Sequence, residues 1–304
     1  MSEINIVCVN EGVPSLKKKY DFIDQIFAFN KIANPEARFH YISNEPTTCP
    51  GVTNHDSKDY HSPTYHKFKE SYVHLSDNPH DFELSCFLRW IILEKFLKSL
   101  SLESVLYLDN DVALYTPVES WPAEFFTSRY SLSLASSPHT NFINNPTTLS
   151  LFIDHLILFY GDHGNRHFRR LQDIRGRFIE SGSLGGVSDM TLWSIFANQD
   201  HGEGMTESDA TATAGSRANY IRDISQVFDN TCTFDHHLSH IGDYERTTVN
   251  REGHSVVQKN IKFINRIPYC FNENLQKDIK FHTVHFQGSA KSCLSNYLNY
   301  ETGA

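Results

Sequence analysis

The alternation of apolar and polar positions divides the start of the chain into strand-like and helix-like segments. The run INIVCVN (4–10) is short and rich in β-branched residues, which predicts a buried first strand. Apolar residues between 15 and 32 recur with a period near 3.6 and predict a helix, and ARFHYISNE (37–45) predicts a second strand. Strand, helix and strand at this spacing favour a βαβ unit and therefore a parallel sheet flanked by helices.

The clearest helix pattern covers residues 78–100. Asn78 is a candidate cap and Pro79 suits the first turn. One apolar stripe follows, made of Leu84, Phe87, Leu88, Ile91, Ile92 and Phe96. The helix leads into a predicted strand at 105–108, whereas residues 46–80 show no sustained period and predict a loop with one short helix.

Later segments continue the mixture of strands and helices. We expect strands at 130–137, 259–265, 267–272 and 279–288, and helices at 147–160, 165–178 and 188–199, the last capped by Ser188. Residues 200–218 almost lack large apolar side chains, so we expect a mobile surface loop there. The order of elements predicts a single α/β globular unit.

Composition narrows the function classes. The 304 residues include 39% hydrophobic ones, enough for a substantial core, and the formal net charge of −9 argues against general nucleic-acid binding. The six cysteines are widely spaced with no CxxC pair, which favours reduced core residues over disulfides or a zinc site. No signal peptide or membrane span is indicated, so we expect a cytoplasmic protein.

An acidic triplet follows the predicted strand at 105–108. In an extended segment Asp109 and Asp111 share a face while Asn110 points away, so the two carboxylates can converge. Their repulsion is removed by a divalent cation, and hard oxygen ligands suit Mg²⁺ or Mn²⁺ completed by water and a substrate's phosphates. The alternative is a solvated acidic turn. The chain becomes apolar again at Val112, which favours the metal site.

Two other regions carry candidate anion-binding groups. Arg89 lies in the middle of the strong helix beside apolar neighbours, so its guanidinium needs either a carboxylate from another element or a phosphate. In HTVHFQGSAKSCL (282–294), His285 ends a strand-like run, Gly288 permits close backbone approach, and Lys291 suits a phosphate. A core histidine and a surface lysine are the alternative, but their combination favours a site.

The segments FLRW, YLDNDVALY, SDMTLW and HFQGSAK together resemble a GT-A-fold, nucleotide-sugar-dependent glycosyltransferase, and the tail is similar to the HxxGxxK element of family-8-like retaining enzymes. The resemblance implies a Rossmann-like GT-A domain over 1–304, with a nucleotide-binding half (1–117) and an acceptor-binding half with a C-terminal metal and phosphate segment (118–304).

The same resemblance implies a role for particular residues. Asp109, Asp111 and His285 would ligate Mn²⁺ or Mg²⁺, and Gly288 and Lys291 would hold the diphosphate of a nucleotide sugar, for which a UDP-sugar is expected. Three further sets follow: Arg89 and Asn110 beside the donor phosphates, Val9 and Asn10 at the base and ribose, and Asp189 near the transferred sugar.

The sequence departs from the pattern at Met190 and at Ser292–Cys293, where those enzymes carry Gln and Pro-Trp. The resemblance implies a retaining transfer to a glycan or glycolipid-like acceptor, in bacterial-type surface polysaccharide synthesis. An inverting enzyme would instead need a carboxylate on the opposite face of the sugar, for which Asp189 is the candidate.

The acceptor side offers one further feature. Five arginines lie within NRHFRRLQDIRGRF (165–178) of an otherwise acidic chain. A solvated basic helix is the preferred interpretation, and the alternative is contact with an anionic acceptor or with the anionic inner face of a membrane that carries a lipid-linked glycan. Two other classes remain open for the whole chain: a haloacid-dehalogenase-type phosphatase, and a glycosyltransferase-like protein that binds nucleotide or glycan without turnover.

Overall fold

The computed structural model describes residues 4–11, 22–198 and 220–298. The loop expected at 200–218 lies outside these residues, as does the beginning of the helix expected at 15–32. Within the described residues no helix combines the length and the apolar character needed to cross a bilayer.

A five-stranded sheet forms the centre of the fold, in the order β3-β2-β1-β4-β6. Its strands are β1 (Asn5–Asn10), β2 (Arg38–Ser43), β3 (Val52–His55), β4 (Val105–Leu108) and β6 (Thr140–Ile143). All neighbours pair in parallel except β4 and β6, which are antiparallel. The prediction of an α/β fold with a mostly parallel sheet is therefore confirmed for this sheet.

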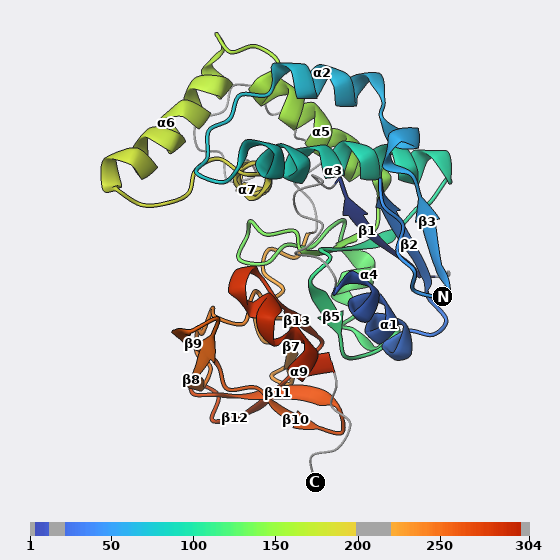
Figure 1. Cartoon of the computed structure of the whole chain (residues 1–304), viewed down its shortest axis with the longest axis vertical. Coiled ribbons are helices and arrows are strands. Elements are labelled where there is room, and N and C mark those ends of the chain that lie inside the picture. Colours follow the sequence, from blue (N-terminus) through green and yellow to red (C-terminus); the bar gives the residue numbers. More distant parts are fainter. Residues whose placement is uncertain (1–3, 12–21, 199–219, 299–304) are drawn as a thin grey trace.

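Helices cover both faces of that sheet (Figure 1). On one face lie α2 (Pro63–Ser71), α3 (His80–Ser99), α5 (Pro146–Tyr160), α6 (Arg166–Ser181) and α7 (Asp189–Asn198). On the other lie α1 (Ile23–Ala33) and the short α4 (Glu124–Thr127). Val7 of β1 packs with the first group and Ile6 and Cys8 with the second, as the two-residue period of a strand requires.

The C-terminal part forms smaller sheets beside the central one (Figure 1). One has the order β10-β11-β12-β7, made of Lys262–Ile264, Ile267–Asn272, Lys277–Phe281 and Cys232–Thr233. Strands β8 (Arg246–Arg251) and β9 (His254–Lys259) form a hairpin. Strand β13 (Thr283–His285) pairs antiparallel with β5 (Val112–Leu114), which ties the C-terminal part to the segment after the acidic triplet.

The short helical segments are η2 (Ser57–Tyr60), η3 (Val118–Ser120), η5 (Gly288–Cys293) and α9 (Leu294–Leu298). Several predicted boundaries match: β1, β2, β4, α5 and α7 fall where the patterns placed them, and Ser188 Oγ accepts a hydrogen bond from Thr191 N at 3.4 Å as a cap does.

Other predictions were wrong. Residues 130–137 do not form a strand, because Leu134 and Ala135 adopt positive φ angles of 50° and 56° and Ser133 and Ser137 close a tight turn around them. The region 46–80 contains β3, η2 and α2 instead of a loop with one helix. Asn78 is not the cap of α3: Pro79 occupies that position, and Asn78 Nδ2 donates to Glu83 instead.

Candidate functional site

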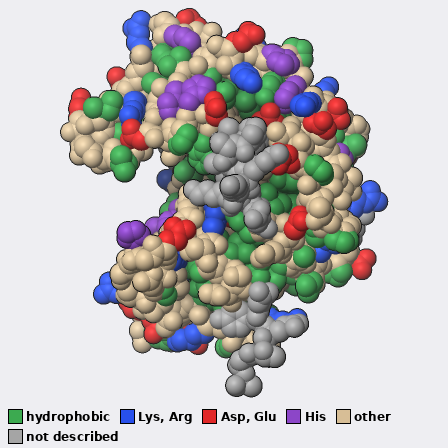
Figure 2. All heavy atoms as spheres, viewed as in Figure 1, with side chains coloured by type: hydrophobic (Ala, Val, Ile, Leu, Met, Phe, Trp, Pro, Cys, Tyr) green, Lys and Arg blue, Asp and Glu red, His purple; other side chains and the backbone are tan. Residues whose placement is uncertain are grey.

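A cleft of about 720 Å³ opens beyond the carboxyl ends of β1 and β4. This is where open α/β sheets bind ligands. Figure 2 shows the surface hollowed between the helical layer and the C-terminal strands. All ten residues that the sequence and its resemblance singled out line the cleft: Val9, Asn10, Arg89, Asp109, Asn110, Asp111, Asp189, His285, Gly288 and Lys291. The structure therefore brings the predicted residues together, while their roles remain predictions.

The acidic triplet forms the turn between β4 and β5. Val112 N donates to Asp109 O at 3.2 Å, and Phe286 N donates to Asp111 O at 2.9 Å. Because β13 pairs with β5 in the register His285 to Val112, the imidazole lies beside the triplet. One ligand atom each of Asp109, Asp111 and His285 lies within 4.8 Å of the others. This group is called the metal-ligand group below.

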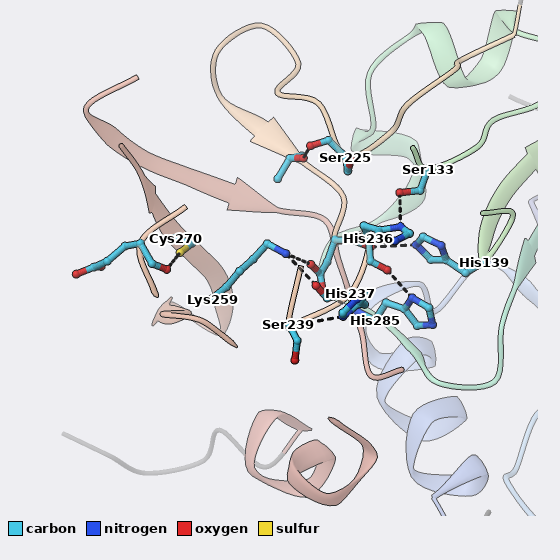
Figure 3. Close-up of polar contacts among 12 residues, drawn as sticks. Ser133, His139, Ser225, His236, His237, Ser239, Lys259, Cys270 and His285 are labelled. Atoms are coloured by element: carbon cyan, nitrogen blue, oxygen red, sulfur yellow. Dashed lines mark hydrogen bonds and ion pairs between the residues drawn. The ribbon is translucent and has the colours of Figure 1, made fainter. Parts of the chain in front are cut away.

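The imidazole of His285 is held in place by His236 and His139 (Figure 3). Its Nδ1 donates to His236 O at 2.6 Å, which leaves Nε2 directed at Asp111 Oδ1, 3.3 Å away. The ring of His139 stacks on it with centroids 4.3 Å apart. Behind both, Asp235 accepts from His285 N at 3.1 Å and pairs with the buried ammonium of Lys259 at 2.8 Å.

Opposite charges dominate the environment of the Asp111 carboxyl. Burial raises its pKa, but His285 and Lys291 lower it more, and the net pKa lies well below the ordinary value. For the imidazole of His285, burial lowers the pKa and Asp111 raises it more, so the net pKa lies above the ordinary value. Lys291 Nζ also bonds Asp111 directly. A cation that entered this group would take over the charge compensation that Lys291 and His285 now supply.

Arg89 bridges two carboxylates across the cleft. Its Nη1 lies 2.7 Å from Asp109 Oδ1 and its Nη2 2.6 Å from Asp189 Oδ2. Of the two partners expected for this guanidinium, the structure has the carboxylate. Burial lowers its pKa, while Asp109 and Asp189 raise it, and the net pKa lies well above the usual range. The Nε atom is buried and has no hydrogen-bond partner among the described residues.

Asp189 begins α7 and is almost fully buried. Its Oδ2 also accepts from Trp90 Nε1 at 2.9 Å, and its Oδ1 accepts from Met190 N at 2.9 Å. Both oxygens are thus already engaged. A carboxylate held by three donors in this way is fixed in position and can orient a group bound in the cleft.

Sequence reasoning missed three polar residues of the cleft. Tyr107 donates to Asp109 Oδ1 at 2.8 Å, Glu11 accepts from His61 and Tyr65, and Glu83 accepts from Ser76 and Asn78. Glu83 was passed over because it interrupts the apolar stripe of α3 between Phe82 and Leu84. A carboxylate inside a buried helical turn was the available signal, since such a group is rarely buried without a partner.

The residues of the metal-ligand group fit Mn²⁺ or Mg²⁺. Two carboxylates and one imidazole are a donor set that either ion accepts, and the Nδ1 bond of His285 leaves its other nitrogen available. Among the described residues only one other group of comparable spacing occurs, formed by Glu83, Cys86 and Asp189.

No protein-family profile and no curated protein matches the chain. Solved structures that it resembles include the PaToxG glycosyltransferase, with a TM-score of 0.34, 12% identity and coverage of 71% of this chain and 86% of that one. Another is the glycosyltransferase GlyE of Streptococcus pneumoniae TIGR4, with a TM-score of 0.28, 10% identity and coverage of 73% and 45%. The apo form of GlyE has a TM-score of 0.30 and 12% identity, with coverage of 79% of this chain and 71% of that one. TM-scores and identities this low support no argument about function, so the functional argument rests on the residues of the cleft.

Proposed function

We propose that the protein is a metal-dependent glycosyltransferase that moves a sugar from a nucleotide diphosphate to an acceptor hydroxyl. The observation that carries the proposal is the metal-ligand group, with its three ligand atoms within 4.8 Å of one another and with Lys291 in direct contact. A hard cation held by Asp109, Asp111 and His285 would bind and neutralise a diphosphate. The other group of comparable spacing in the described part of the chain, Glu83, Cys86 and Asp189, lies in the same cleft but has a softer thiol in place of the imidazole.

The chain's own cations explain how the leaving group would be stabilised. Breaking the bond between sugar and phosphate builds negative charge on the departing diphosphate. Lys291 reaches the cleft from η5 and Arg89 from α3, so both can present a positive charge to the phosphates. Each is paired with a carboxylate in the structure, and we propose that the diphosphate competes for them when it binds.

The finer assignments are also proposals. We infer that Val9 and Asn10, at the end of β1, contact the base and ribose, with UDP as the expected nucleotide. Asn110 and Gly288 would contact the phosphates. Asn110 Oδ1 is buried and finds no hydrogen-bond partner in the described part of the chain, and Gly288 has a positive φ of 61° that favours glycine. We propose a single GT-A domain over 1–304, because the metal-ligand group takes residues from both proposed halves, 1–117 and 118–304.

For the acceptor we propose a glycan or a lipid-linked glycan, in surface polysaccharide synthesis, with retention at the anomeric carbon. Helix α6 carries the basic residues considered for this role. Arg175 is paired with Asp77 at 2.6 Å, whereas Arg170 and Arg177 are exposed. This fits a solvated helix and also an anionic partner. Replacing Arg170 and Arg177 with Gln should impair transfer to lipid-linked acceptors only if α6 contacts that partner.

The test of the proposal is ligand-dependent stability. The purified protein would be melted with each of a panel of nucleoside diphosphates and nucleotide sugars, in MnCl₂ and again in EDTA. Binding to the folded state alone raises stability, by about 2.7 kcal/mol at a ligand concentration of 100 Kd. A shift with one nucleotide that disappears in EDTA is expected. If no nucleotide raises the melting temperature in Mn²⁺, the proposed function is wrong.

Neither alternative has an observation in its favour. The phosphatase class places its Asp-x-Asp motif after the first strand, whereas Asp109 follows β4, the fourth strand along the chain. A protein that binds without turnover would be expected to have lost a metal ligand, and Asp109, Asp111 and His285 are all in place.

A further inference from the structure

A second group of polar side chains lines the same cleft and shares no residue with the metal-ligand group. One ligand atom each of Glu83, Cys86 and Asp189 lies within 4.8 Å of the others. Glu83 and Cys86 lie in the first two turns of α3, and Asp189 begins α7. All three line the cleft.

The contacts of Arg89 place this group relative to the metal-ligand group. Its guanidinium bonds Asp109 through Nη1 and Asp189 through Nη2, so the width of the guanidinium separates the two carboxylates. Glu83 in turn neighbours Asp189. A series of contacts therefore runs from Asp109 through Arg89 and Asp189 to Glu83, away from the place proposed for the diphosphate. A sugar attached to that diphosphate extends beyond the phosphates, and this series marks one direction in which it can lie.

The carboxylate of Glu83 is only half satisfied. Its Oε2 accepts from Ser76 Oγ at 3.1 Å and from Asn78 Nδ2 at 2.7 Å. Both of these bonds go to Oε2, and no described residue donates a hydrogen bond to Oε1. Glu83 is 1% exposed and lines the cleft, so Oε1 has lost most of its contact with bulk water. A ligand hydroxyl in the cleft would supply the donor that Oε1 lacks.

The surroundings of Glu83 determine which ligands it can accept. Burial raises the pKa of its carboxyl, as does the charge of Asp189, while Asn78, Ser76 and Arg89 act in the opposite direction. The net pKa lies above the ordinary value. The other titratable groups that face it are Cys86, Tyr72 and Tyr160, and none of them carries a positive charge. A hydrogen-bond donor is favoured here, and a second carboxylate would be repelled.

We propose that Glu83 is a specificity-determining residue that accepts a hydrogen bond from a hydroxyl of the transferred sugar, and that Glu83 and Asp189 together select neutral sugars over uronic acids. This inference rests on the proposed function. It identifies the transferred sugar by its chemistry. The sugar is a neutral hexose with a hydroxyl that reaches Glu83 Oε1 and without a carboxylate near that hydroxyl.

The test separates the sugar from the nucleotide. Calorimetric titrations in MnCl₂ would compare UDP, UDP-glucose, UDP-galactose and UDP-glucuronate, with GDP and GDP-mannose as a second series. The wild type should bind a neutral UDP-sugar more tightly than UDP, or GDP-mannose more tightly than GDP. It should bind UDP-glucuronate at least tenfold more weakly than the neutral nucleotide sugar that it binds most tightly. This comparison needs no variant.

Glu83→Gln should then weaken the binding of the neutral nucleotide sugar by on the order of tenfold, because one charge-assisted hydrogen bond is lost. The affinity for the nucleoside diphosphate without a sugar should not change. The variant should also narrow the discrimination against UDP-glucuronate. Asp81→Asn is the matched control: Asp81 lies in the same helical turn and lines the same cleft, but its one side-chain partner among the described residues is the neighbouring His80. It should leave every affinity near that of the wild type.

The outcomes are distinct. If diphosphates bind in Mn²⁺ but glucuronate and neutral donors bind equally well, the inference is wrong and the proposed function stands. If Glu83→Gln weakens the binding of UDP and of UDP-glucose equally, Glu83 serves the structure of α3 and the inference is wrong. If the variant weakens only the binding of an acceptor, Glu83 contacts the acceptor instead of the donor sugar, and the inference is wrong as well. If no diphosphate binds in Mn²⁺, both proposals fail.

Discussion

At the scale of single residues, Asp111 is the centre of the metal-ligand group because it contacts both His285 and Lys291. Asp111→Asn removes the charge but keeps the shape. Loss of an outer partner of a metal ligand alone costs 10–100-fold in metal affinity, so loss of the ligand's charge should weaken Mn²⁺ binding by roughly 100-fold or more. Calorimetric titration with MnCl₂ measures this, and circular dichroism reports whether the fold is retained.

Asp278→Asn, on the exposed side of β12, is the control for this change. Mn²⁺ affinity within a factor of two of the wild type in Asp111→Asn, as in the control, would show that the carboxylates serve the β4–β5 turn instead of a cation.

Lys291 allows a sharper distinction, since it occupies the carboxylate that a metal would need. Lys291→Ala should leave Mn²⁺ affinity unchanged or slightly higher, because it frees Asp111. It should weaken UDP binding in Mn²⁺ by about tenfold, because a charge-assisted phosphate contact is lost. Titrations with MnCl₂ alone and with UDP in MnCl₂ separate the two effects. Unchanged UDP affinity, as expected for the exposed Lys277→Ala, would make Lys291 an ordinary surface lysine.

The candidate residues could be found from the sequence where their chemistry conflicts with their surroundings. Asp109 and Asp111 end an apolar strand, and Arg89 interrupts an apolar helix, so each required a partner or a ligand. Which partner it was could not be predicted: the bridge from Arg89 to Asp189 spans 100 positions in the chain. Glu83 had the same signal as Arg89, but its acceptor bonds come from a loop whose path has no periodic pattern.

At the scale of elements, the segment that precedes α7 is paired to the segment that precedes α3. Val187 N donates to Leu75 O at 2.9 Å, and Asp77 N donates to Gly185 O at 3.1 Å. Gly186 makes the approach possible: its φ is +150°, and a Cβ there would lie 2.3 Å from Leu75 O. These bonds hold Asp189 and Glu83 in the same part of the cleft.

Gly186→Ala should therefore destabilise the protein by about 1–3 kcal/mol, since backbone would have to move and the residue would be strained. Gly176→Ala is its counterpart within α6, where a Cβ meets nothing within 4 Å, and it should be neutral or stabilising by up to about 1 kcal/mol. Urea denaturation of both variants measures the difference. Equal stability of the two would remove the close approach as a constraint on the cleft.

Elements with a clean period were predictable, and those defined by turn geometry were not. The apolar stripes of α3 and α5 gave both helices nearly to the residue. The alternation YSLSLASS was read as a strand, yet it folds into a turn because Leu134 and Ala135 adopt positive φ angles that such residues rarely take. The β8–β9 hairpin was missed because its strands are mostly exposed and lack alternating large apolar residues.

At the scale of the whole molecule, the site depends on one long-range pairing. Strand β13 lies beside β5, and this places His285 and Lys291, from the end of the chain, next to Asp111. Local patterns predicted apolar, strand-like segments near both strands. They contain no information about which strands, far apart in the sequence, pair with each other. The resemblance linked Asp109 and Asp111 to His285 and Lys291, and local sequence patterns alone could not.

Buried and half-buried histidines in both parts of the molecule predict how its stability depends on pH. Burial lowers the pKa of His155 in α5 to about 3, and likewise lowers the pKa of His282 to about 3, of His236 to about 3 and of His237 to about 4. In the unfolded chain these groups take up protons near pH 6.5, so as pH falls below that value the unfolded state binds more protons and stability decreases. The loss should begin well above the range in which carboxylates titrate.

His155→Phe isolates one of these groups, because the ring packs against Phe159 and Phe196 and its buried Nε2 has no hydrogen-bond partner within the described ranges. Each such histidine contributes a slope of up to about 1.4 kcal/mol per pH unit below pH 6.5. The variant should therefore lose less unfolding free energy between pH 6 and pH 5 than the wild type, by about that amount, in urea titrations at the two pH values. The exposed His254→Gln is the control. Identical slopes in the wild type and His155→Phe would mean that His155 takes up its proton in the folded protein, and that the helical layer around α5 is open to water.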